Sequence, residues 1–297
     1  MKKNIFLVAS LLMIAICIPQ CCGASDNGEG KKEQKDIAIQ LYSVRDDIGK
    51  DYAGTIKAVG AAGYTAVETA NYNDGKFYGR TPEEFKQDLA DAGMTALSSH
   101  TMRHLSKEEL EAKDFTEAMK WWDQAVAAHK AAGMSYIVCA GIGVDNLDQL
   151  KTYCEYFNQI GEKCKEAGLK FGYHNHDYEL RNKYDDNVMY DFMIQNTNPE
   201  SVVFEMDVYW VVRGGQSPVE YFNRYPGRFE LLHVKDYKEL GQSGMVGFDA
   251  IFRNTDVAGV KHLVVEVEQY NYTPIESITK SLDYLLGCPL VKKSYVK

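Results

Sequence analysis

The sequence repeats a short apolar run followed by a helical segment eight times, and this alternation constrains the fold more than any other feature. The apolar runs end roughly every 30 residues, the length of a strand, a helix and two loops in an α/β barrel. We expect strands at 37–43, 66–69, 96–100, 136–140, 170–176, 202–208, 231–236 and 262–268. The pattern predicts an α/β protein with a single (β/α)8 TIM barrel over residues 36–290 and a short tail at 291–297.

Helix start and stop signals support the same register. A capping hydroxyl with a glutamate three residues later begins four expected helices, and three of these also have proline in the first turn, at Thr81, Ser217 and Thr273; the fourth begins at Ser106. Gly133 and Gly168 suit left-handed positions at helix ends. We expect one helix over about 106–132, in which at least one of Trp121 and Trp122 is core. An open doubly wound sheet would need a glycine loop after its first strand, and residues 44–47 form none.

Polar side chains alternate with apolar ones at the ends of the last four expected strands. Residues two apart in a strand share a face, so each strand presents one polar pair: His174 and His176, Glu205 and Asp207, His233 and Lys235, and Glu266 and Glu268. Strands covered by helices are normally apolar on both faces. The carboxyl ends of barrel strands hold active sites, so we expect these side chains to converge there.

Composition excludes some partners. The formal net charge of -9 argues against nucleic-acid binding, which needs a basic face. Cys154 and Cys164 lie ten positions apart on one expected helix, too far for a disulfide, and the cysteines lack metal-knuckle spacing. The oligomeric state is left open.

The N-terminus has the pattern of an export signal. A basic start is followed by an uncharged, mostly apolar stretch over 4–20 that is short for a membrane span. Cys21 and Cys22 follow, which resembles a bacterial lipoprotein signal. We expect a signal peptide at 1–22 and a flexible tether at 23–35, in an exported protein that is periplasmic or anchored in the outer membrane only through this lipid. The alternative is a soluble periplasmic protein cleaved near 22–24.

Asp207, His233 and Glu266 stand at the ends of successive expected strands. Mixed oxygen and nitrogen ligands suit one divalent metal ion such as Mn²⁺, Zn²⁺, Co²⁺ or Mg²⁺. Taken singly, each residue has a structural explanation as a hydrogen-bonded or salt-bridged side chain. Three strands presenting such groups at one height favour a shared site.

The chain resembles the xylose isomerase-like barrel family, which includes sugar epimerases, inosose dehydratase and endonuclease IV. The resemblance covers about 37–290 and rests on the segments 40–46, 67–68, 173–176, 233–236 and 265–266, together with Asp207. It implies a metal site of Glu, Asp, His and Glu from strands five to eight, which corresponds here to His174, Asp207, His233 and Glu266. The chain departs from the pattern at His174, where the epimerases have Glu.

The resemblance implies a metal-dependent isomerase or epimerase that acts on a small-molecule sugar through an enediolate. Because His174 disturbs the pair of exchanging carboxylates, a keto-sugar lyase, hydratase or dehydratase is the alternative, and a non-catalytic carbohydrate-binding protein is a further one. We assign Glu266 as base, His176 as acid and base, and Lys235 as a donor to substrate oxygens. The alternative for Lys235 is a buried ion pair with Asp207 or Glu205.

The substrate itself is expected to contact four residues, Tyr42, Glu68, His100 and Glu268. The glycine-rich loop 241–247 has the type of backbone that binds phosphate in such barrels, but phosphorylated sugars are mainly cytoplasmic. The export signal therefore favours an unphosphorylated sugar, glycoside or keto-sugar.

Overall fold

The computed structural model describes residues 34–296. Eight parallel strands form one sheet in the order β5-β2-β1-β12-β11-β10-β7-β6. Between β5 and β6, a bridge joins His100 to Val138 and Thr101 N donates to the Val138 carbonyl (2.9 Å), so the sheet nearly closes into a barrel. The barrel strands are β1 (Ala38–Gln40), β2 (Ala66–Thr69), β5 (Thr95–Ser99), β6 (Tyr136–Cys139), β7 (Lys170–His174), β10 (Val202–Asp207), β11 (Leu231–Lys235) and β12 (His262–Glu266).

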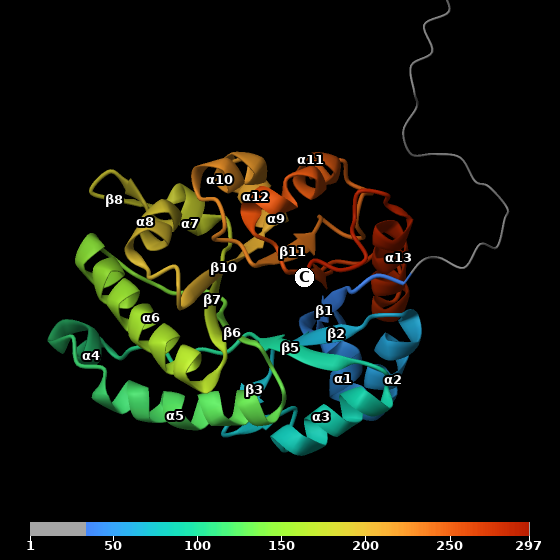
Figure 1. Cartoon of the computed structure of the whole chain (residues 1–297), viewed down its shortest axis with the longest axis horizontal. Helices are drawn as coiled ribbons and strands as arrows, with labels where there is room; N and C mark the ends of the chain where they lie inside the picture. The colour runs from blue at the N-terminus through green and yellow to red at the C-terminus, as the bar shows by residue number, and fades with distance from the viewer. Residues whose placement is uncertain (1–33, 297) are drawn as a thin grey trace, which may run out of the picture. The chain divides into compact units, whose positions relative to one another are not determined.

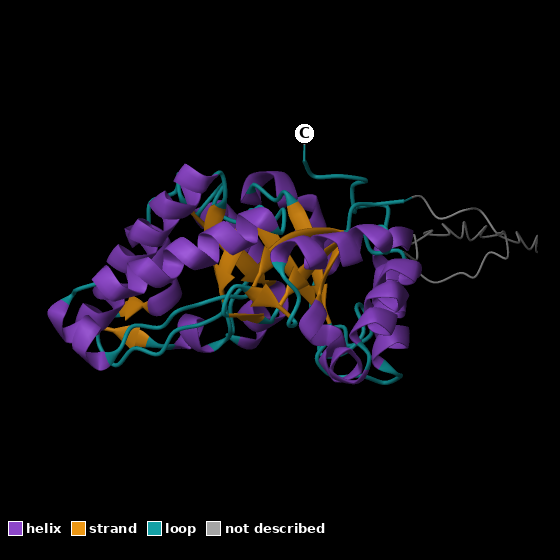
Figure 2. Cartoon of the chain, turned by 90° about the horizontal axis from the view of Figure 1, so that it is seen from below, coloured by secondary structure: helices purple, strands orange, loops and turns teal. Residues whose placement is uncertain are grey.

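Helices follow the strands in chain order and surround the barrel as an outer ring (Figure 1). Figure 2 shows them flanking the strands from a second direction. The helices are α1 (Arg45–Lys50), α2 (Tyr52–Ala62), α3 (Pro82–Asp91), α4 (Lys107–Ala112), α5 (Thr116–Ala131), α6 (Leu147–Ala167), α7 (Tyr178–Arg181), α8 (Met189–Asn196), α9 (Val208–Arg213), α10 (Pro218–Arg224), α11 (Phe248–Arg253), α12 (Thr255–Ala258) and α13 (Pro274–Gly287). The predicted single (β/α)8 barrel is confirmed.

The predicted helix boundaries follow from capping chemistry. Thr81 and Ser106 each accept a hydrogen bond from the backbone of the glutamate three residues on, and that glutamate bonds back to the cap amide. Gly133 and Gly168 both have φ +83° at helix ends, as predicted. The hydroxyls of Ser217 and Thr273 also cap their helices, without the reciprocal glutamate bond.

Some expected elements differ from the structure. The helix expected at 106–132 is two helices, α4 and α5, because Lys113 takes a left-handed conformation (φ +53°) and Asp114 caps the amide of Thr116. Trp122 is fully buried, whereas Trp121 is half-buried. Two short hairpins in the loops were not predicted: β3 (Tyr72–Asn73) with β4 (Lys76–Phe77), and β8 (Lys183–Tyr184) with β9 (Asn187–Val188).

Several strands are shorter than expected. The strand expected at 37–43 ends at Gln40, and Tyr42 lies in the 3-10 helix η1 (Leu41–Val44). The strands expected to end at His176 and Glu268 end at His174 and Glu266. Polar residues continue the alternation into the loops after the hydrogen-bonded ladder has stopped. The strand ends predicted from this alternation were therefore too late in the chain.

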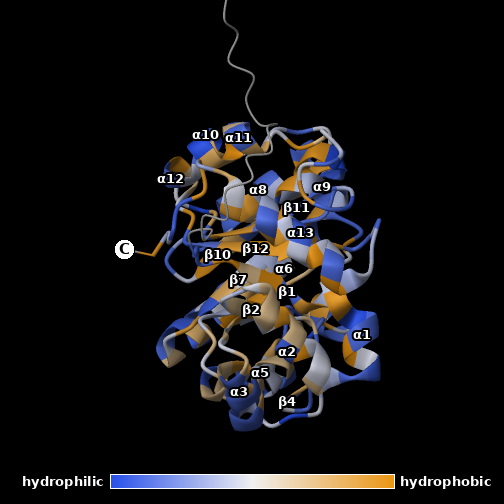
Figure 3. Ribbon diagram, turned by 90° about the vertical axis from the view of Figure 1, so that its right-hand side faces the viewer, coloured by the Kyte–Doolittle hydropathy of each residue, from blue (hydrophilic) through white to orange (hydrophobic). Residues whose placement is uncertain are grey.

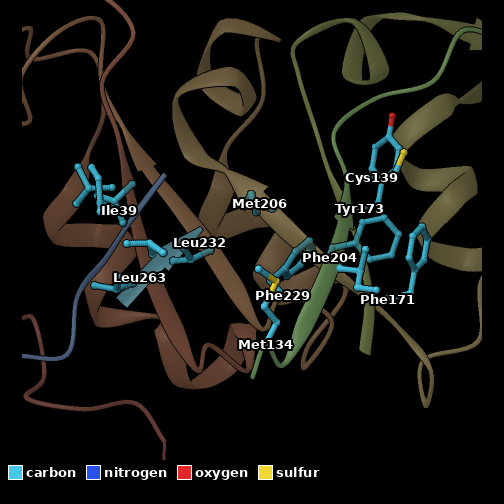
Figure 4. Packing of buried hydrophobic residues seen from close by; sticks show 14 of the residues in the cluster. Ile39, Met134, Cys139, Phe171, Tyr173, Phe204, Met206, Phe229, Leu232 and Leu263 are labelled. Carbon is cyan, nitrogen blue, oxygen red and sulfur yellow. The ribbon is translucent and has the colours of Figure 1, made fainter. Parts of the chain in front are cut away.

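The outward faces of the strands form the main core, between the sheet and the helices. Phe171 and Tyr173 from β7 pack beside Phe204 and Met206 from β10, and all four are fully buried (Figure 4). Burying an aromatic or methionine side chain contributes about 1.5–3 kcal/mol. Figure 3 shows the hydrophobic strands at the centre, with hydrophilic residues on the surrounding helices.

A second, smaller apolar cluster fills the inside of the barrel below the polar layer. It contains one or more side chains from six strands: Ala38, Leu97, Tyr136, Val138, Val203, Leu231 and Val264. We call this cluster the barrel floor. Because the inward positions change from apolar to polar along each strand, the polar side chains lie only toward the carboxyl ends.

Residues near both ends of the described chain show that the fold extends beyond the limits predicted for the barrel. The expected signal peptide and most of the expected tether lie outside the described residues. Lys35, expected in the tether, is buried, and its ammonium donates to the carbonyls of Leu285 (2.9 Å) and Cys288 (2.7 Å), so the fold already includes it. Val291, in the expected tail, is also buried. Within 34–296, no helix has the length and apolar character required to cross a membrane.

Candidate functional site

Four side chains of the predicted metal-ligating type meet at the carboxyl ends of neighbouring strands. They are His174 on β7, Asp207 on β10, His233 on β11 and Glu266 on β12, and one ligand atom of each lies within 4.8 Å of the others. His174 Nε2 lies 3.1 Å from His233 Nδ1 and 3.5 Å from Asp207 Oδ2. His233 Nδ1 lies 3.6 Å from Glu266 Oε2. We call these four residues the ligand cluster.

The ligand cluster fits a divalent cation. Asp207 Oδ2 is buried and has no hydrogen-bond partner, whereas the other oxygen accepts from Trp210 N (2.9 Å). A buried polar atom without a partner is costly, and a cation at this point would remove that cost. Two imidazoles and two carboxylates are a donor set that Zn²⁺ and Mn²⁺ accept, and water or substrate would complete the coordination.

Protonation states in the ligand cluster differ between its members. Burial, with His233 and His100 nearby, holds the pKa of His174 well below its ordinary value, so its imidazole is neutral. Burial also raises the pKa of Asp207 to about 7, against the opposing effect of Lys235. Burial disfavours ionised Glu266 too, but Lys235 and His233 outweigh it and hold the pKa of this carboxyl below its usual range. Glu266 is therefore the ionised carboxylate.

A second polar layer lies beneath the ligand cluster. Glu68 from β2 is fully buried and accepts a hydrogen bond from His233 Nε2 (2.8 Å). His100 Nε2 lies 2.9 Å from both Glu68 Oε1 and Glu205 Oε2. Burial opposes protonation of His100, but Glu68 and Glu205 outweigh it and raise the pKa to about 10. Glu68, predicted to contact the substrate, instead lies behind His233.

A cavity of about 220 Å³ opens above the ligand cluster. It is lined by Tyr42, Ala70, His100, Ala140, His174, His176, Glu266 and Glu268. Three of the four predicted substrate contacts, Tyr42, His100 and Glu268, therefore face it, as does the predicted acid and base His176. Among residues 34–296, no lysine or arginine lines this cavity.

Lys235 lies beside this cavity. Its side chain is 2% exposed, and its ammonium pairs with Glu266 Oε2 (3.0 Å) and Glu268 Oε2 (2.9 Å). The expected alternative partners, Asp207 and Glu205, form no such pair. Lys235 thus neutralises the two carboxylates that border the cavity.

His176 lies two residues beyond the end of β7. Its ring stacks on Tyr178 (centroids 5.8 Å apart, 13° between planes), and its backbone amide donates to Glu179 Oε2 (2.8 Å). His176 Nδ1 is buried without a partner and lies on the side of Gly141. Burial lowers the pKa of His176, so the ring is neutral near pH 7. A neutral imidazole at the cavity wall can accept a proton and later donate it.

Part of the glycine-rich loop after β11 is already bonded to a carboxylate of the protein. The carboxylate of Asp236 accepts from Gly241 N (3.0 Å) and from the Ser243 hydroxyl. Ser243 Oγ in turn accepts from Met245 N (3.0 Å). A carboxylate of the protein itself thus occupies the position expected for phosphate.

Sequence reasoning assigned no functional role to three residues that the structure places in the site. Glu205 shares a face with Asp207, and this alternation was the available signal for it. Asn175 has the opposite parity, yet its Oδ1 accepts from Asp207 N (3.1 Å) and so fixes the backbone of that ligand. Trp210 lies against Lys235, with the ammonium 5.7 Å from the ring centroid, and against His176. No sequence signal identified the last two.

The fold and the ligand cluster together define a (β/α)8 barrel enzyme with a candidate metal site at the carboxyl ends of four strands. The description of the family whose model matches residues 56–288 is xylose isomerase-like TIM barrel, and the chain belongs to this family. The match covers all eight barrel strands except β1.

Similar proteins include both isomerases and dehydratases. The chain is 34% identical to the solved structure of a sugar phosphate isomerase/epimerase from Parabacteroides distasonis ATCC 8503, over 93% of this chain and 100% of that one, with a TM-score of 0.78. It is 26% identical to an inosose dehydratase from Clostridium perfringens, over 65% of this chain and 67% of that protein. The IOLI protein, solved with a bound zinc atom, shares the fold at 12% identity over 87% of this chain and 99% of that one (TM-score 0.64).

Proposed function

We propose that this protein is a divalent-metal-dependent enzyme that removes the proton next to the carbonyl group of an unphosphorylated sugar or keto-sugar. This proposal is carried by the ligand cluster of His174, Asp207, His233 and Glu266, of which His174 and Glu266 line the same cavity as His176. A bound ion would act as a Lewis acid that polarises the substrate carbonyl and stabilises negative charge on its oxygens.

The residues of the chain supply the proton transfers. Glu266 and His176 both border the cavity, one as an ionised carboxylate and the other as a neutral imidazole, so each is a candidate base for the proton that leaves to form the enediolate. Lys235, paired with Glu266 and Glu268, helps to keep Glu266 ionised and is near enough to the rim to favour anionic substrate oxygens.

The two proton-transfer groups favour elimination as the outcome. A symmetric epimerisation uses two similar bases on opposite sides of one carbon, whereas this site has a carboxylate and an imidazole. After accepting a proton, His176 becomes an imidazolium whose lowered pKa makes it a good acid toward a departing hydroxyl or alkoxyl group. The similarity to inosose dehydratase supports loss of water or an alcohol from a keto-sugar.

Isomerisation or epimerisation is the second candidate. Two groups that border one cavity can also remove a proton from one position and return it at another, or on the opposite face. The 34% identity to a sugar phosphate isomerase/epimerase over almost the whole chain supports this outcome. Both candidates share the first step and differ in the fate of the proton.

An unphosphorylated substrate is part of the proposal. A phosphate group is normally bound by arginine, lysine or free backbone amides. The described cavity wall has no such cation, and Asp236 already occupies the amide of Gly241.

The first experiment measures bound metal and then follows unphosphorylated aldoses, ketoses and 3-keto-glycosides in D₂O by NMR. Elimination gives loss of water or of the aglycone, whereas isomerisation gives deuterium beside the carbonyl with an unchanged formula. Asp207→Ala should lose both metal and turnover, while Asp123→Ala on the exposed face of α5 should keep both. Wild-type protein that holds no divalent ion, or an active Asp207→Ala variant, would refute metal dependence. Binding of sugars without turnover would favour a carbohydrate-binding protein.

Export belongs to the proposal as well. The segment that carries the signal, with Cys21 and Cys22, lies outside the described residues. Growth of the producing cells with labelled palmitate, followed by fractionation and mass spectrometry of the N-terminal peptide, tests it. A cytoplasmic protein that retains Met1 to Gln20 would contradict export.

A further inference from the structure

The second polar layer links the half of the barrel that has no metal ligands to the half that has them. All four members of the ligand cluster come from β7, β10, β11 and β12. Glu68 comes from β2, yet it accepts a hydrogen bond from His233 Nε2 at 2.8 Å. We propose that Glu68 is a positioning residue that fixes the tautomer and orientation of His233 for ion binding; this rests on the proposed metal dependence.

The tautomer follows from the chemistry of the contact. An ionised carboxylate only accepts hydrogen bonds, so His233 Nε2 carries the hydrogen and Nδ1 is left to ligate. Nδ1 is the nitrogen that faces His174 Nε2 (3.1 Å) and Glu266 Oε2 (3.6 Å). A carboxylate behind a ligating imidazole also raises its basicity, and loss of such a partner typically weakens metal affinity about 10–100-fold.

Glu68 is itself held rigidly enough for this task. Gln40 Nε2 donates to its Oε1 (2.8 Å) and the Ser98 hydroxyl donates to its Oε2 (2.6 Å). Both donors come from the register partners of Glu68 on β1 and β5. A carboxylate clamped by two neighbouring strands has little rotamer freedom, so the position of His233 is set from across the barrel.

Glu205 cannot replace Glu68 in this role with the same geometry. Its Oε2 lies 3.4 Å from His233 Nε2, compared with 2.8 Å for Glu68, and its Oε1 has no partner at all. Its shorter contact, 2.9 Å, is to His100. We therefore expect Glu68 to carry more of the effect than Glu205.

The test compares Glu68→Gln and Glu68→Ala with the wild-type protein. Glutamine retains an acceptor oxygen but loses the charge, and alanine loses both. We expect the dissociation constant for Mn²⁺ or Zn²⁺, measured by calorimetry on protein freed of metal with a chelator, to rise about tenfold for Glu68→Gln and about 100-fold for Glu68→Ala. Glu239→Gln removes a charge from an equally buried carboxylate bonded to Asn271 and Ser277, away from the ligand cluster, and should leave metal affinity unchanged.

A second readout is independent of metal binding and of turnover. Nitrogen chemical shifts of His233 in the metal-free protein are recorded at alkaline pH, because Glu205, Glu266 and Glu68 outweigh burial and hold the pKa of this imidazole well above its ordinary value. Once the ring is neutral, the shifts should report hydrogen on Nε2 in the wild type and in Glu68→Gln, and a mixture of tautomers in Glu68→Ala. Unchanged shifts and unchanged affinity in Glu68→Ala would overturn the proposal. So would two ions bound per wild-type chain and one per Glu68→Ala chain, because Glu68 would then be a ligand of a second ion. If wild-type protein binds no ion, the proposed function fails while the tautomer measurement still decides the role of Glu68.

Discussion

Lys235 offers the most quantitative test of the electrostatics in the site. The substitution Lys235→Met keeps the length of the side chain and removes the cation between Glu266 and Glu268. The Lys235 side chain is 2% exposed and its ammonium lies 3.0 Å and 2.9 Å from the two carboxylates, so both would lose this counter-charge and Glu266 would keep only the nearby His233, 3.6 Å away. Removal of one partner of a buried ion pair costs about 3–5 kcal/mol.

The lower end of that range applies here, because Glu268 is 32% exposed and water screens its charge. We therefore expect metal-free Lys235→Met to lose about 3 kcal/mol of unfolding free energy, which corresponds to a fall of about 6–12 °C in Tm for a domain of this size. Urea titration followed by circular dichroism, with a chelator present, measures the first quantity, and calorimetry the second.

A matched control comes from the other end of the barrel. Lys261 Nζ lies at the same distance, 3.0 Å, from Glu230 Oε1, but its side chain is 44% exposed. Lys170 also remains beside Glu230 when Lys261 is replaced. Lys261→Met should therefore cost less than about 1 kcal/mol.

A bound divalent ion should reduce the difference in unfolding free energy between Lys235→Met and the wild type, because an ion held by Glu266 replaces part of the missing positive charge. The reasoning is wrong if metal-free Lys235→Met unfolds within about 0.5 kcal/mol of the wild type, or if its loss equals that of Lys261→Met. An effect that does not change on addition of Mn²⁺ or Zn²⁺ would contradict the position of the ion beside Glu266.

The remaining predictions concern protons and one glycine. Metal affinity measured by calorimetry should fall as pH drops below about 7, by up to about tenfold per pH unit, because burial raises the pKa of Asp207 to about 7 and this carboxyl must lose its proton to ligate; constant affinity from about pH 5.5 to 7 would contradict this. The same shift makes the metal-free protein less stable as pH rises toward 7, since the folded state retains a proton that the unfolded state has released. His176→Asn should lower kcat about 10²–10⁴-fold with metal content unchanged, and loss of metal would instead assign His176 to the ligands. Gly141→Ala should cost about 1–3 kcal/mol in urea unfolding, because Gly141 has φ +133° and a Cβ would lie 2.9 Å from the Tyr178 hydroxyl. Gly79→Ala, at φ +78° with open space around it, isolates the backbone contribution.

The inward or outward direction of each strand side chain was predictable, because it depends only on the alternation of successive side chains between the two faces of a strand. The outward positions Phe171, Phe204 and Met206 are fully buried, and the inward positions His174 and Asp207 meet in the ligand cluster. The order of the strands around the barrel then followed from the repeat, since parallel strands joined by helices lie beside each other. These inferences needed no distance between side chains.

Element ends were less predictable for a local reason. Tyr42 and His176 continue the polar alternation, but the chain leaves the ladder before each of them. The break at Lys113 depends on a left-handed residue that is not glycine, which sequence patterns seldom reveal. The two loop hairpins have strands of only two residues, too short for any periodicity.

Within the site, the position of Glu68 differs most from the expectation drawn from the sequence. From the sequence, a glutamate at a strand end is equally suited to a substrate, an ion or another side chain. Its contact with His233 joins residues 165 positions apart, and only the curvature of the closed barrel brings them together. Asn175 was given no role for a similar reason. Strand parity predicts that its side chain points away from the ligand cluster, yet it accepts a hydrogen bond from the backbone amide of Asp207 on the neighbouring strand.

The barrel floor has a consequence for isotope exchange. Val138, Val203, Leu231 and Val264 are 0–2% exposed and lie between the polar layers and the amino-terminal ends of the strands, so we expect protons to exchange mainly through the mouth. When a sugar fills the cavity it blocks that mouth, and the proton held by His176 or Glu266 is then shielded from solvent. If the reaction is isomerisation, a substrate labelled with deuterium beside its carbonyl should therefore pass part of its label into the product even in ordinary water, whereas elimination removes that label from the sugar product.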